Sequence, residues 1–225
     1  MLSKSQQRLL LALQKRKERE ERKMFIIEGE KFVRDAGSLV EFTFTDRDTT
    51  IYREVISTDA PQGKAAVARV PEWTMKDITS KPTIVVLDGI QDPGNVGTVL
   101  RACLGFNASL LLVESAEVTN PKTVRASASA ILRVPWMTVS REEAPEILTG
   151  LERPIFRLEL KKTAVTPMEI SPKDRIIIAG NEGKGIKLPL NGTSVAIPHN
   201  PALESLNVAM ATSIVLYELC RTSKL

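Results

Sequence analysis

The strongest constraint on the fold is a regular alternation of apolar strands and helical segments that begins near residue 83. Runs rich in Val, Ile and Leu at 84–88, 110–114 and 175–179 have the composition of strands that are buried on both faces. Further strands are expected at 136–139, 155–160 and 194–197, and helices at 96–106, 123–132, 142–151 and 206–221. This order predicts an α/β domain with a parallel sheet that is covered by helices on both faces.

A smaller α+β unit is expected before this domain. Residues 3–22 have the charged, breaker-free composition of a helix, and a second helix is predicted at 30–36. Short strands are predicted at 24–27, 39–45 and 65–70, the last after the turn at Pro61 to Gly63. We therefore expect a small unit over residues 1–70, a linker over 71–82 and the larger domain over 83–225.

The charge of the chain is concentrated near its start. Lys and Arg outnumber Asp and Glu by 31 to 27 over 225 residues, whereas residues 1–34 alone contain ten basic and five acidic side chains. This surplus permits a polyanionic partner for the N-terminal segment. Cys103 and Cys220 are distant and lie among apolar residues, so reduced thiols are favoured over a disulfide or a metal site. The apolar run at 9–13 is too short for a signal peptide or membrane span.

The first of three informative loops runs from Asp88 to Arg101 with the sequence D-G-I-Q-D-P-G-N-V-G-T-V-L-R. Gly94 and Gly97 allow backbone to approach a ligand, and Asn95 offers both a donor and an acceptor. Arg101 lies one turn beyond Gly97, where a guanidinium suits a phosphate or carboxylate. An ordinary strand-to-helix connection fits the segment equally well, and the G-x-G-x-x-G dinucleotide fingerprint is missing.

The second loop has three glycines directly after a predicted strand, in the sequence I-I-I-A-G-N-E-G-K-G-I at 176–186. Its glycines surround Asn181 and Glu182, which suggests a pocket lined by backbone with a carboxylate for a positive or hydroxyl-bearing ligand. The P-loop pattern cannot be laid over this segment. A plain turn after a core strand remains the alternative.

The third loop, V-A-I-P-H-N-P-A-L-E-S-L-N-V-A at 195–209, precedes the last predicted helix. Pro198 and Pro201 restrict its path, and Ser205 is expected to cap the helix with Asn207 in the first turn. His199 is the only histidine of the chain, but no partner that would make it a catalytic base is visible in the sequence.

Taken together and in this order, the three loops resemble the motifs of the SpoU/TrmH family of RNA ribose 2′-O-methyltransferases, in the SPOUT superfamily. The resemblance spans about residues 83–221, through D-P-G-N-V-G-T-V-L-R, G-N-E-G-K-G-I, I-P and E-S-L-N-V-A. Residues 1–70 resemble the family's substrate-binding extension, which is similar to RNA-binding ribosomal proteins, through F-I-I-E-G-E-K at 25–31 and A-P-Q-G at 60–63.

The resemblance implies a C-terminal domain with a deep trefoil knot, a homodimer formed through that domain, and S-adenosylmethionine as cofactor. It also implies methylation of a ribose 2′-hydroxyl, in ribosomal RNA by preference and in transfer RNA as a second possibility. A cytoplasmic enzyme without a metal or a membrane partner is expected. Because a free guanidinium remains protonated, we interpret the motif-one arginine, Arg101, as a phosphate clamp that also stabilises a developing alkoxide.

The resemblance also supplies candidate residues. Those expected to act in catalysis are Arg101, Asn95, Glu182, Ser205 and Asn207. Those expected to hold the cofactor are Gly180, Asn181, Gly183, Ile197, Pro198 and Leu206. The basic residues expected to contact RNA are Arg8, Arg16, Arg22, Lys23 and Lys31.

Two departures from the family pattern keep other functions open. Where I-P-M-x-G is common this chain has I-P-H-N-P, and Ala209-Met210 replaces a common S-V. Because proline holds φ near −65°, the loop must follow another path if the family glycine uses a positive φ. A non-catalytic RNA-binding or ribosome-assembly protein is therefore the alternative of another class. A nucleotide-dependent oxidoreductase comes third, and the missing dinucleotide fingerprint argues against it.

Overall fold

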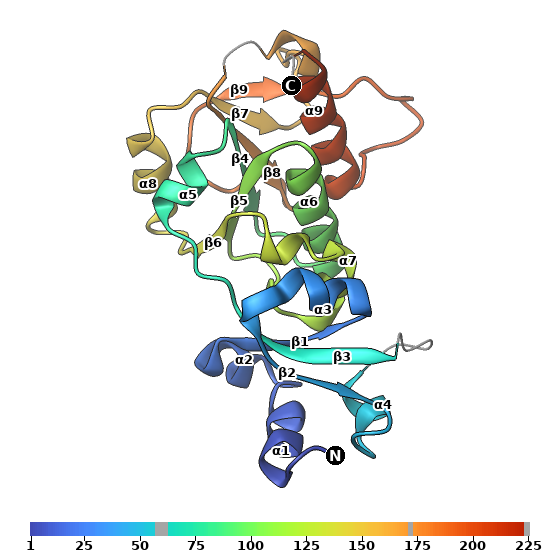
Figure 1. The fold of residues 1–225 in the computed structure, drawn as a ribbon. Helices are drawn as coiled ribbons and strands as arrows, with labels where there is room; N and C mark the ends of the chain where they lie inside the picture. Colours follow the sequence, from blue (N-terminus) through green and yellow to red (C-terminus); the bar gives the residue numbers. More distant parts are fainter. Residues whose placement is uncertain (57–62, 171–172, 223–225) are drawn as a thin grey trace.

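Two β-sheets organise the chain in the computed structural model, which describes residues 1–56, 63–170 and 173–222 (Figure 1). The smaller sheet is antiparallel and has the strand order β1-β3-β2, with β1 at Met24–Glu28, β2 at Val40–Thr45 and β3 at Lys64–Arg69. The helices of this unit are α1 (Lys4–Ala12), α2 (Arg16–Arg22), α3 (Glu30–Ala36) and α4 (Tyr52–Val55). The A-P-Q-G motif at 60–63 lies, except for Gly63, outside the described residues.

The larger sheet has six strands in the order β6-β5-β4-β8-β7-β9, and every neighbouring pair is parallel. Its strands are β4 (Thr83–Asp88), β5 (Ala108–Val113), β6 (Trp136–Val139), β7 (Ile155–Leu158), β8 (Arg175–Gly180) and β9 (Thr193–Val195). All residues of β4 and β5 are buried, as expected for strands covered on both faces. The predicted parallel α/β sheet is confirmed, while the trefoil knot and the domain boundaries stay predictions.

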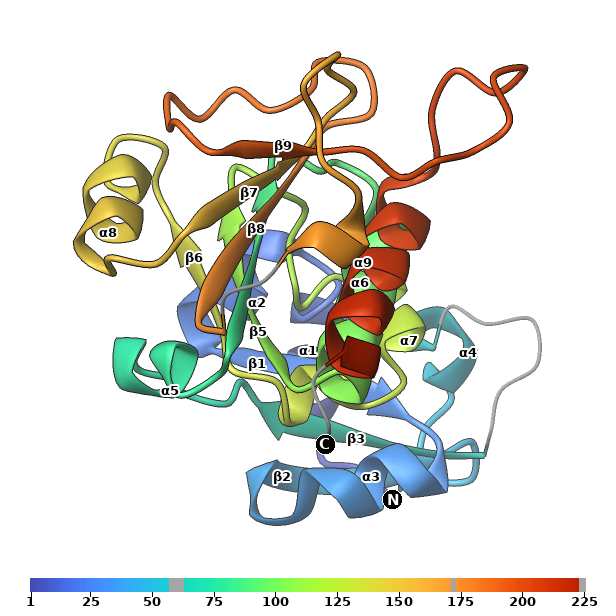
Figure 2. The same ribbon diagram turned by 90° about the horizontal axis from the view of Figure 1, so that it is seen from above.

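Helices form a layer on each face of the larger sheet (Figure 2). On one face, α6 (Pro93–Gly105), α7 (Pro121–Ser127) and α9 (Val208–Thr222) cover alternate strand residues such as Val85 and Leu110. On the other face, α5 (Met75–Thr79) and α8 (Ala144–Gly150) cover Ile84, Leu111 and their neighbours. Short 3₁₀ turns lie at Gly37–Leu39, Ala130–Leu132 and Pro167–Glu169.

The two units pack against each other through β1, α3 and α7, and Figure 1 shows α7 between α3 and α6. Phe25, Ile27 and Phe32 of the small unit belong to the same apolar core as α6 and α7. A buried ion pair crosses this junction, from Arg19 Nη2 to Glu117 Oε2 at 2.6 Å, with the side chains only 4% and 9% exposed. The small unit is therefore held firmly against α7.

The helix predicted over residues 3–22 is wrong as a single element, because the chain breaks after α1. Lys15 is extended, with φ −92° and ψ 134°, and α2 starts at the next residue. The reason is the guanidinium of Arg19, whose Nη1 donates to the carbonyl groups of Leu13 and Gln14 while its other nitrogens bind Glu117. Tertiary contacts thus override the local helix propensity.

Two further expectations also need correction. The segment predicted as a linker contains α5, which begins with a capping box between Thr74 and Asp77 and buries Ile78 completely. The helix predicted at 123–132 ends at Ser127, because Ala128 and Ser129 have positive φ angles of 46° and 70°. Ser129 donates to Asp35 of the small unit at 2.7 Å, so the break serves the junction between the two units.

The two cysteines are free thiols, as the sequence predicts. Cys103 lies in the core, where burial raises its pKa well above the ordinary value, whereas Cys220 is half-buried. None of the helices in the described part of the chain combines the length and the hydropathy that crossing a bilayer requires.

Candidate active site

The three informative loops meet at the carboxyl edge of the parallel sheet, where ligands of open α/β sheets bind. Asp88 at the end of β4 and Gly180 at the end of β8 are register partners, so the first and second loops start side by side. The second and third loops enclose a cavity of about 270 Å³ together with the end of β7. Its lining includes Gly180, Asn181, Glu182, Ile197, Ser205 and Leu206.

Three polar side chains from the three loops form a hydrogen-bonded chain beside this cavity. Asn95, in the first turn of α6, donates from Nδ2 to Glu182 Oε1 at 2.7 Å. Asn207 donates from Nδ2 to Asn95 Oδ1 at 3.0 Å. Segments 112 residues apart are therefore joined through Asn95, with all three side chains accessible to solvent.

Asn207 also caps the last helix, which corrects the expectation that Ser205 does so. Its Oδ1 accepts hydrogen bonds from the backbone of Ala209 at 3.0 Å and Met210 at 3.2 Å. The helix begins at Val208, two residues later than predicted, and Ser205 is left on the wall of the cavity. One asparagine thus fixes both the start of α9 and the position of Asn95.

Asn181 shapes the second loop and ties it to the first. Its Oδ1 accepts from the backbone of Gly183 and Lys184, both at 3.0 Å, and its Nδ2 donates to the carbonyl of Gly89 at 3.0 Å. A Cβ at Gly180 would overlap the backbone of Gly185, so only glycine allows the loop to fold back at this point. These contacts preform one wall of the cavity.

The glycine at 97 has a different role from the one expected. A Cβ there would lie 2.6 Å from the Cβ of Ala126 and 3.0 Å from the backbone nitrogen of Ser127. Gly97 therefore permits close packing of α6 on α7 and brings no backbone to a ligand.

Some predicted residues lie outside the cavity. Arg101 is exposed on α6 and makes no hydrogen bond or ion pair to another described residue. Gly183 is not part of the lining, and Pro198 lines a neighbouring cavity of about 470 Å³ together with His199 and Pro201. His199 borders both cavities, and its Nδ1 lies 2.7 Å from the carbonyl oxygen of Ile197. Through residues 196–207 no φ is positive, so this loop follows a path that Pro201 can adopt.

The basic residues expected to contact RNA are all exposed on the small unit, but their surroundings differ. Arg16 pairs with Glu20 at 2.7 Å, Arg22 with Glu18 at 2.8 Å, and Lys23 with Glu72 at 3.6 Å. Arg8 and Lys31 form no ion pair with a residue that the structure describes. Arg19, another basic residue of this segment, is buried at the junction described above.

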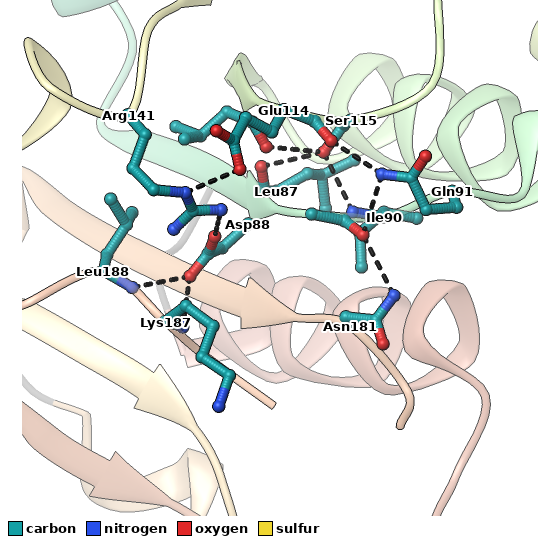
Figure 3. Close-up of polar contacts among 12 residues, drawn as sticks. Leu87, Asp88, Ile90, Gln91, Glu114, Ser115, Arg141, Asn181, Lys187 and Leu188 are labelled. Atoms are coloured by element: carbon teal, nitrogen blue, oxygen red, sulfur yellow. Dashed lines mark hydrogen bonds and ion pairs between the residues drawn. The ribbon is translucent and has the colours of Figure 1, made fainter. Parts of the chain in front are cut away.

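Sequence reasoning missed a buried charge at the end of β4 (Figure 3). The carboxylate of Asp88 is fully buried and accepts from Arg141 Nη2 at 2.8 Å and from the backbone of Lys187 at 2.5 Å and Leu188 at 2.7 Å. Arg141 also binds Glu114 at 2.6 Å. A lone carboxylate that ends an apolar strand was the available signal, because such a charge must find partners when it is buried.

A second missed residue is Glu159, which follows β7 and lines the 270 Å³ cavity. Arg157, Lys161 and Ser194 surround its carboxylate. Within residues 1–56, 63–170 and 173–222, no group of three His, Cys, Asp or Glu side chains is arranged to hold a metal ion.

Comparisons with known proteins agree on one family. The sequence profile of the SpoU rRNA Methylase family matches residues 82–217. A 23S rRNA (guanosine(2553)-2′-O)-methyltransferase of Bacillus subtilis is 29% identical over 237 residues, with 92% of each chain covered. An uncharacterized tRNA/rRNA methyltransferase of Synechocystis is 32% identical over 179 residues, which cover 76% of this chain and 65% of that relative, slightly less than two thirds.

Similarity to solved structures extends over both units. The AdoMet-bound rRNA methyltransferase of Sinorhizobium meliloti superposes with a TM-score of 0.88 at 25% identity. The superposition covers 100% of this chain and 97% of the other. The small unit and the parallel-sheet domain therefore share their arrangement with that protein.

Proposed function

Because the chain belongs to the SpoU rRNA Methylase family, we propose that it transfers the methyl group of S-adenosylmethionine to a ribose 2′-hydroxyl of ribosomal RNA. The observation that carries the proposal is the chain of hydrogen bonds from Glu182 through Asn95 to Asn207 beside a cavity at the sheet edge. Support comes from the Bacillus subtilis relative, named as a 23S rRNA 2′-O-methyltransferase, and from the AdoMet-bound Sinorhizobium meliloti structure.

The residues around the cavity fit such a cofactor. Leu158, Ile197 and Leu206 supply apolar walls for a flat base, and Gly180 leaves backbone accessible where a side chain would intrude. Two carboxylates, Glu159 and Glu182, suit a ligand that carries hydroxyl and cationic groups. We propose that Gly180, Ile197 and Leu206 hold the adenosine through their backbone, with Asn181 and Gly183 shaping the loop and Pro198 directing the third loop past it.

S-adenosylmethionine supplies a methyl group that is already activated by its positive sulfur, so the protein mainly has to position the acceptor. We assign this task to Asn95, Glu182 and Asn207, whose mutual hydrogen bonds fix the direction in which each can meet a ribose hydroxyl. Ser205, on the cavity wall, offers one further hydroxyl donor and acceptor.

Arg101 is assigned to the RNA, since its exposed guanidinium does not line the cavity. A planar fork with five donors binds a phosphate well, and a bound phosphate would fix the target nucleotide while the cation stabilises a developing alkoxide. An Arg101→Ala protein that methylates RNA at the parental rate would contradict this assignment.

The small unit is proposed to hold the RNA through salt-sensitive phosphate contacts. Arg8 and Lys31 are the strongest candidates, because acidic neighbours compete for Arg16, Arg22 and Lys23. Recognition would rest on RNA shape and an accessible nucleotide more than on duplex sequence.

We also propose a homodimer through α9. Met210 and Tyr217 on this helix are 54% and 52% exposed, and the ring of Tyr217 meets Phe106 at the end of α6 edge to face, with centroids 6.3 Å apart. Large apolar side chains that are exposed together mark an interface. Free thiols and an RNA substrate suit a cytoplasmic enzyme.

The decisive experiment incubates the protein with ribosomal RNA and S-adenosylmethionine that carries a labelled methyl group, and then maps the label. Label on a single ribose 2′-oxygen is expected. Label on bases alone would contradict the proposal. Transfer RNA serves as the second substrate, and binding of RNA without any transfer would favour a non-catalytic ribosome-assembly protein.

A further inference from the structure

Glu159 occupies a central place at the edge of the sheet that bears the cavity. It directly follows Leu158, which is the register partner of Ala179 in β8 and of Val195 in β9. Its backbone nitrogen donates to the carbonyl of Val195 at 3.2 Å. Glu159 therefore lies between Gly180 and Ala196, and all three line the cavity.

The carboxylate of Glu159 is held through only one of its two oxygens. Ser194 Oγ at 2.7 Å, Lys161 Nζ at 2.8 Å and Arg157 Nε at 3.1 Å all bind Oε1. Arg157 is itself fixed by the carbonyl groups of Leu188 at 3.2 Å and Leu190 at 2.6 Å. This arrangement fixes the orientation of the carboxylate from three sides.

The second oxygen, Oε2, accepts no hydrogen bond from any residue in the described part of the chain. It is also not one of the buried polar atoms that lack a partner, although the side chain as a whole is only 20% exposed. Oε2 is therefore accessible, and Glu159 is one of the residues that line the cavity. A purely structural role for Glu159 would explain the three contacts of Oε1, but it would not explain why Oε2 has no partner among the residues that the structure describes.

Glu159 is charged whenever the protein is near neutral pH. Partial burial raises its pKa, but the hydrogen bonds from Lys161, Ser194 and Arg157 outweigh this effect and lower the pKa to about 2. A fixed carboxylate oxygen in a largely apolar cavity is a strong acceptor for an O–H or N–H donor of a ligand.

We propose that Oε2 of Glu159 accepts a hydrogen bond from a ribose hydroxyl of the bound S-adenosylmethionine. The inference rests on the proposed function, and it names a residue that selects for the ribose of the cofactor. Position favours the ribose, since Glu159 adjoins Gly180 and Ala196, next to the backbone proposed to hold the adenosine. In other parallel α/β folds a carboxylate near the sheet edge binds a ribose hydroxyl in the same way.

The test is a double-mutant cycle read by calorimetry and independent of catalysis. Wild-type protein and Glu159→Gln are titrated with 5′-methylthioadenosine, which keeps the ribose and lacks the amino-acid part, and with its 2′-deoxy and 3′-deoxy forms. For wild type, removal of the bonded hydroxyl is expected to weaken binding about 10- to 100-fold, as for a hydrogen bond to a charged group. Glu159→Gln should weaken binding of 5′-methylthioadenosine by a similar factor. The affinities of this variant for 5′-methylthioadenosine and for the form that lacks the bonded hydroxyl should then differ less than threefold.

The matched control is Glu169→Gln, which alters a carboxylate in the 3₁₀ turn outside the cavity and should bind all three compounds like wild type. Thermal unfolding without ligand checks that Glu159→Gln is folded. Equal weakening of all three compounds by Glu159→Gln would overturn the inference, as would a loss of affinity confined to S-adenosylmethionine itself. If wild-type protein binds S-adenosylmethionine but has equal affinity for 5′-methylthioadenosine and its deoxy forms, this inference alone is overturned. If wild-type protein binds none of these compounds, the proposed function is overturned as well.

Discussion

Two polar clusters join distant parts of this chain, and they differ in how far the protein itself satisfies them. At the junction of the two units, Arg19 donates to Glu117 and to the carbonyl groups of Leu13 and Gln14, and Thr119 donates to Glu117 as well. At the sheet edge, Asn95, Glu182 and Asn207 are bound to one another but remain accessible to solvent.

The difference separates stability from function. A buried charge with all its hydrogen bonds made inside the protein has nothing left to offer a ligand, but it is costly to disrupt. An accessible chain of amides and a carboxylate adds little stability, because water replaces its bonds, yet it can meet a substrate. Glu159 combines both kinds of group: its Oε1 is bound by three partners inside the protein, whereas its Oε2 remains available to a ligand.

The largest effect is expected from Arg19→Ala. The substitution leaves the carboxylate of Glu117 buried without its cation, so the free energy of unfolding should fall by about 3–5 kcal/mol. Urea unfolding followed by fluorescence or circular dichroism measures this change. The folded fraction should keep its affinity for S-adenosylmethionine, because the junction lies outside the cavity.

The control for this prediction is Arg22→Ala on the same helix, which removes an exposed i,i+4 pair with Glu18. Its cost should be within about 0.5 kcal/mol. An equal loss of unfolding free energy for the two substitutions would contradict the prediction, because it would mean that the buried pair between Arg19 and Glu117 contributes no more than the exposed pair.

The second effect is on catalysis and comes from Asn95→Ala. Loss of this amide removes one hydrogen bond from Glu182 and one from Asn207, so the acceptor ribose is less well oriented and kcat for methyl transfer should fall about 100-fold. Stability should change by less than about 1 kcal/mol, since the lost bonds are accessible to water. Single-turnover methylation assays and urea unfolding on the same preparation test both halves of the prediction.

Asn191→Ala is the matched control, because Asn191 is an exposed asparagine in the loop before β9 and outside the cavity. It should leave both methyl transfer and stability unchanged. If Asn95→Ala destabilised the protein by several kcal/mol and kept its kcat, the distinction drawn between the two clusters would be reversed.

The sequence predicts most of the larger domain because its evidence is local. Continuous apolar runs identified β4 and β8 to within one residue and β5 to within two, and a parallel sheet then requires the loops after them to lie at one edge. The meeting of Asn95, Glu182 and Asn207 follows from the same topology. The helix α5 was also predictable, since Thr74 and Asp77 have the spacing of a capping box.

What the sequence could not predict depends on partners far away in the chain. The break between α1 and α2 exists because Arg19 binds Glu117, 98 residues later. Likewise, Arg157 and Lys161 are sequence neighbours of Glu159, but its third partner, Ser194, comes beside it only when β9 pairs with β7. Ser205 and Asn207 are both good caps, and only the actual start of α9 decides between them.

The smallest effect is expected at the surface that is proposed to bind RNA, where basic side chains with and without an acidic partner can be compared. Lys31→Ala should weaken RNA binding a few-fold and reduce the slope of log K against log salt by about 0.7–0.9, as expected when one phosphate contact is lost. Arg16→Ala should change both quantities less, because Glu20 already holds that guanidinium at 2.7 Å and its release toward a phosphate costs an existing bond. Filter binding at several salt concentrations compares the two variants. A larger slope change for Arg16→Ala than for Lys31→Ala would mean that RNA phosphates replace the acidic partners along α2. A basic side chain that is paired on the surface would then still be able to bind RNA.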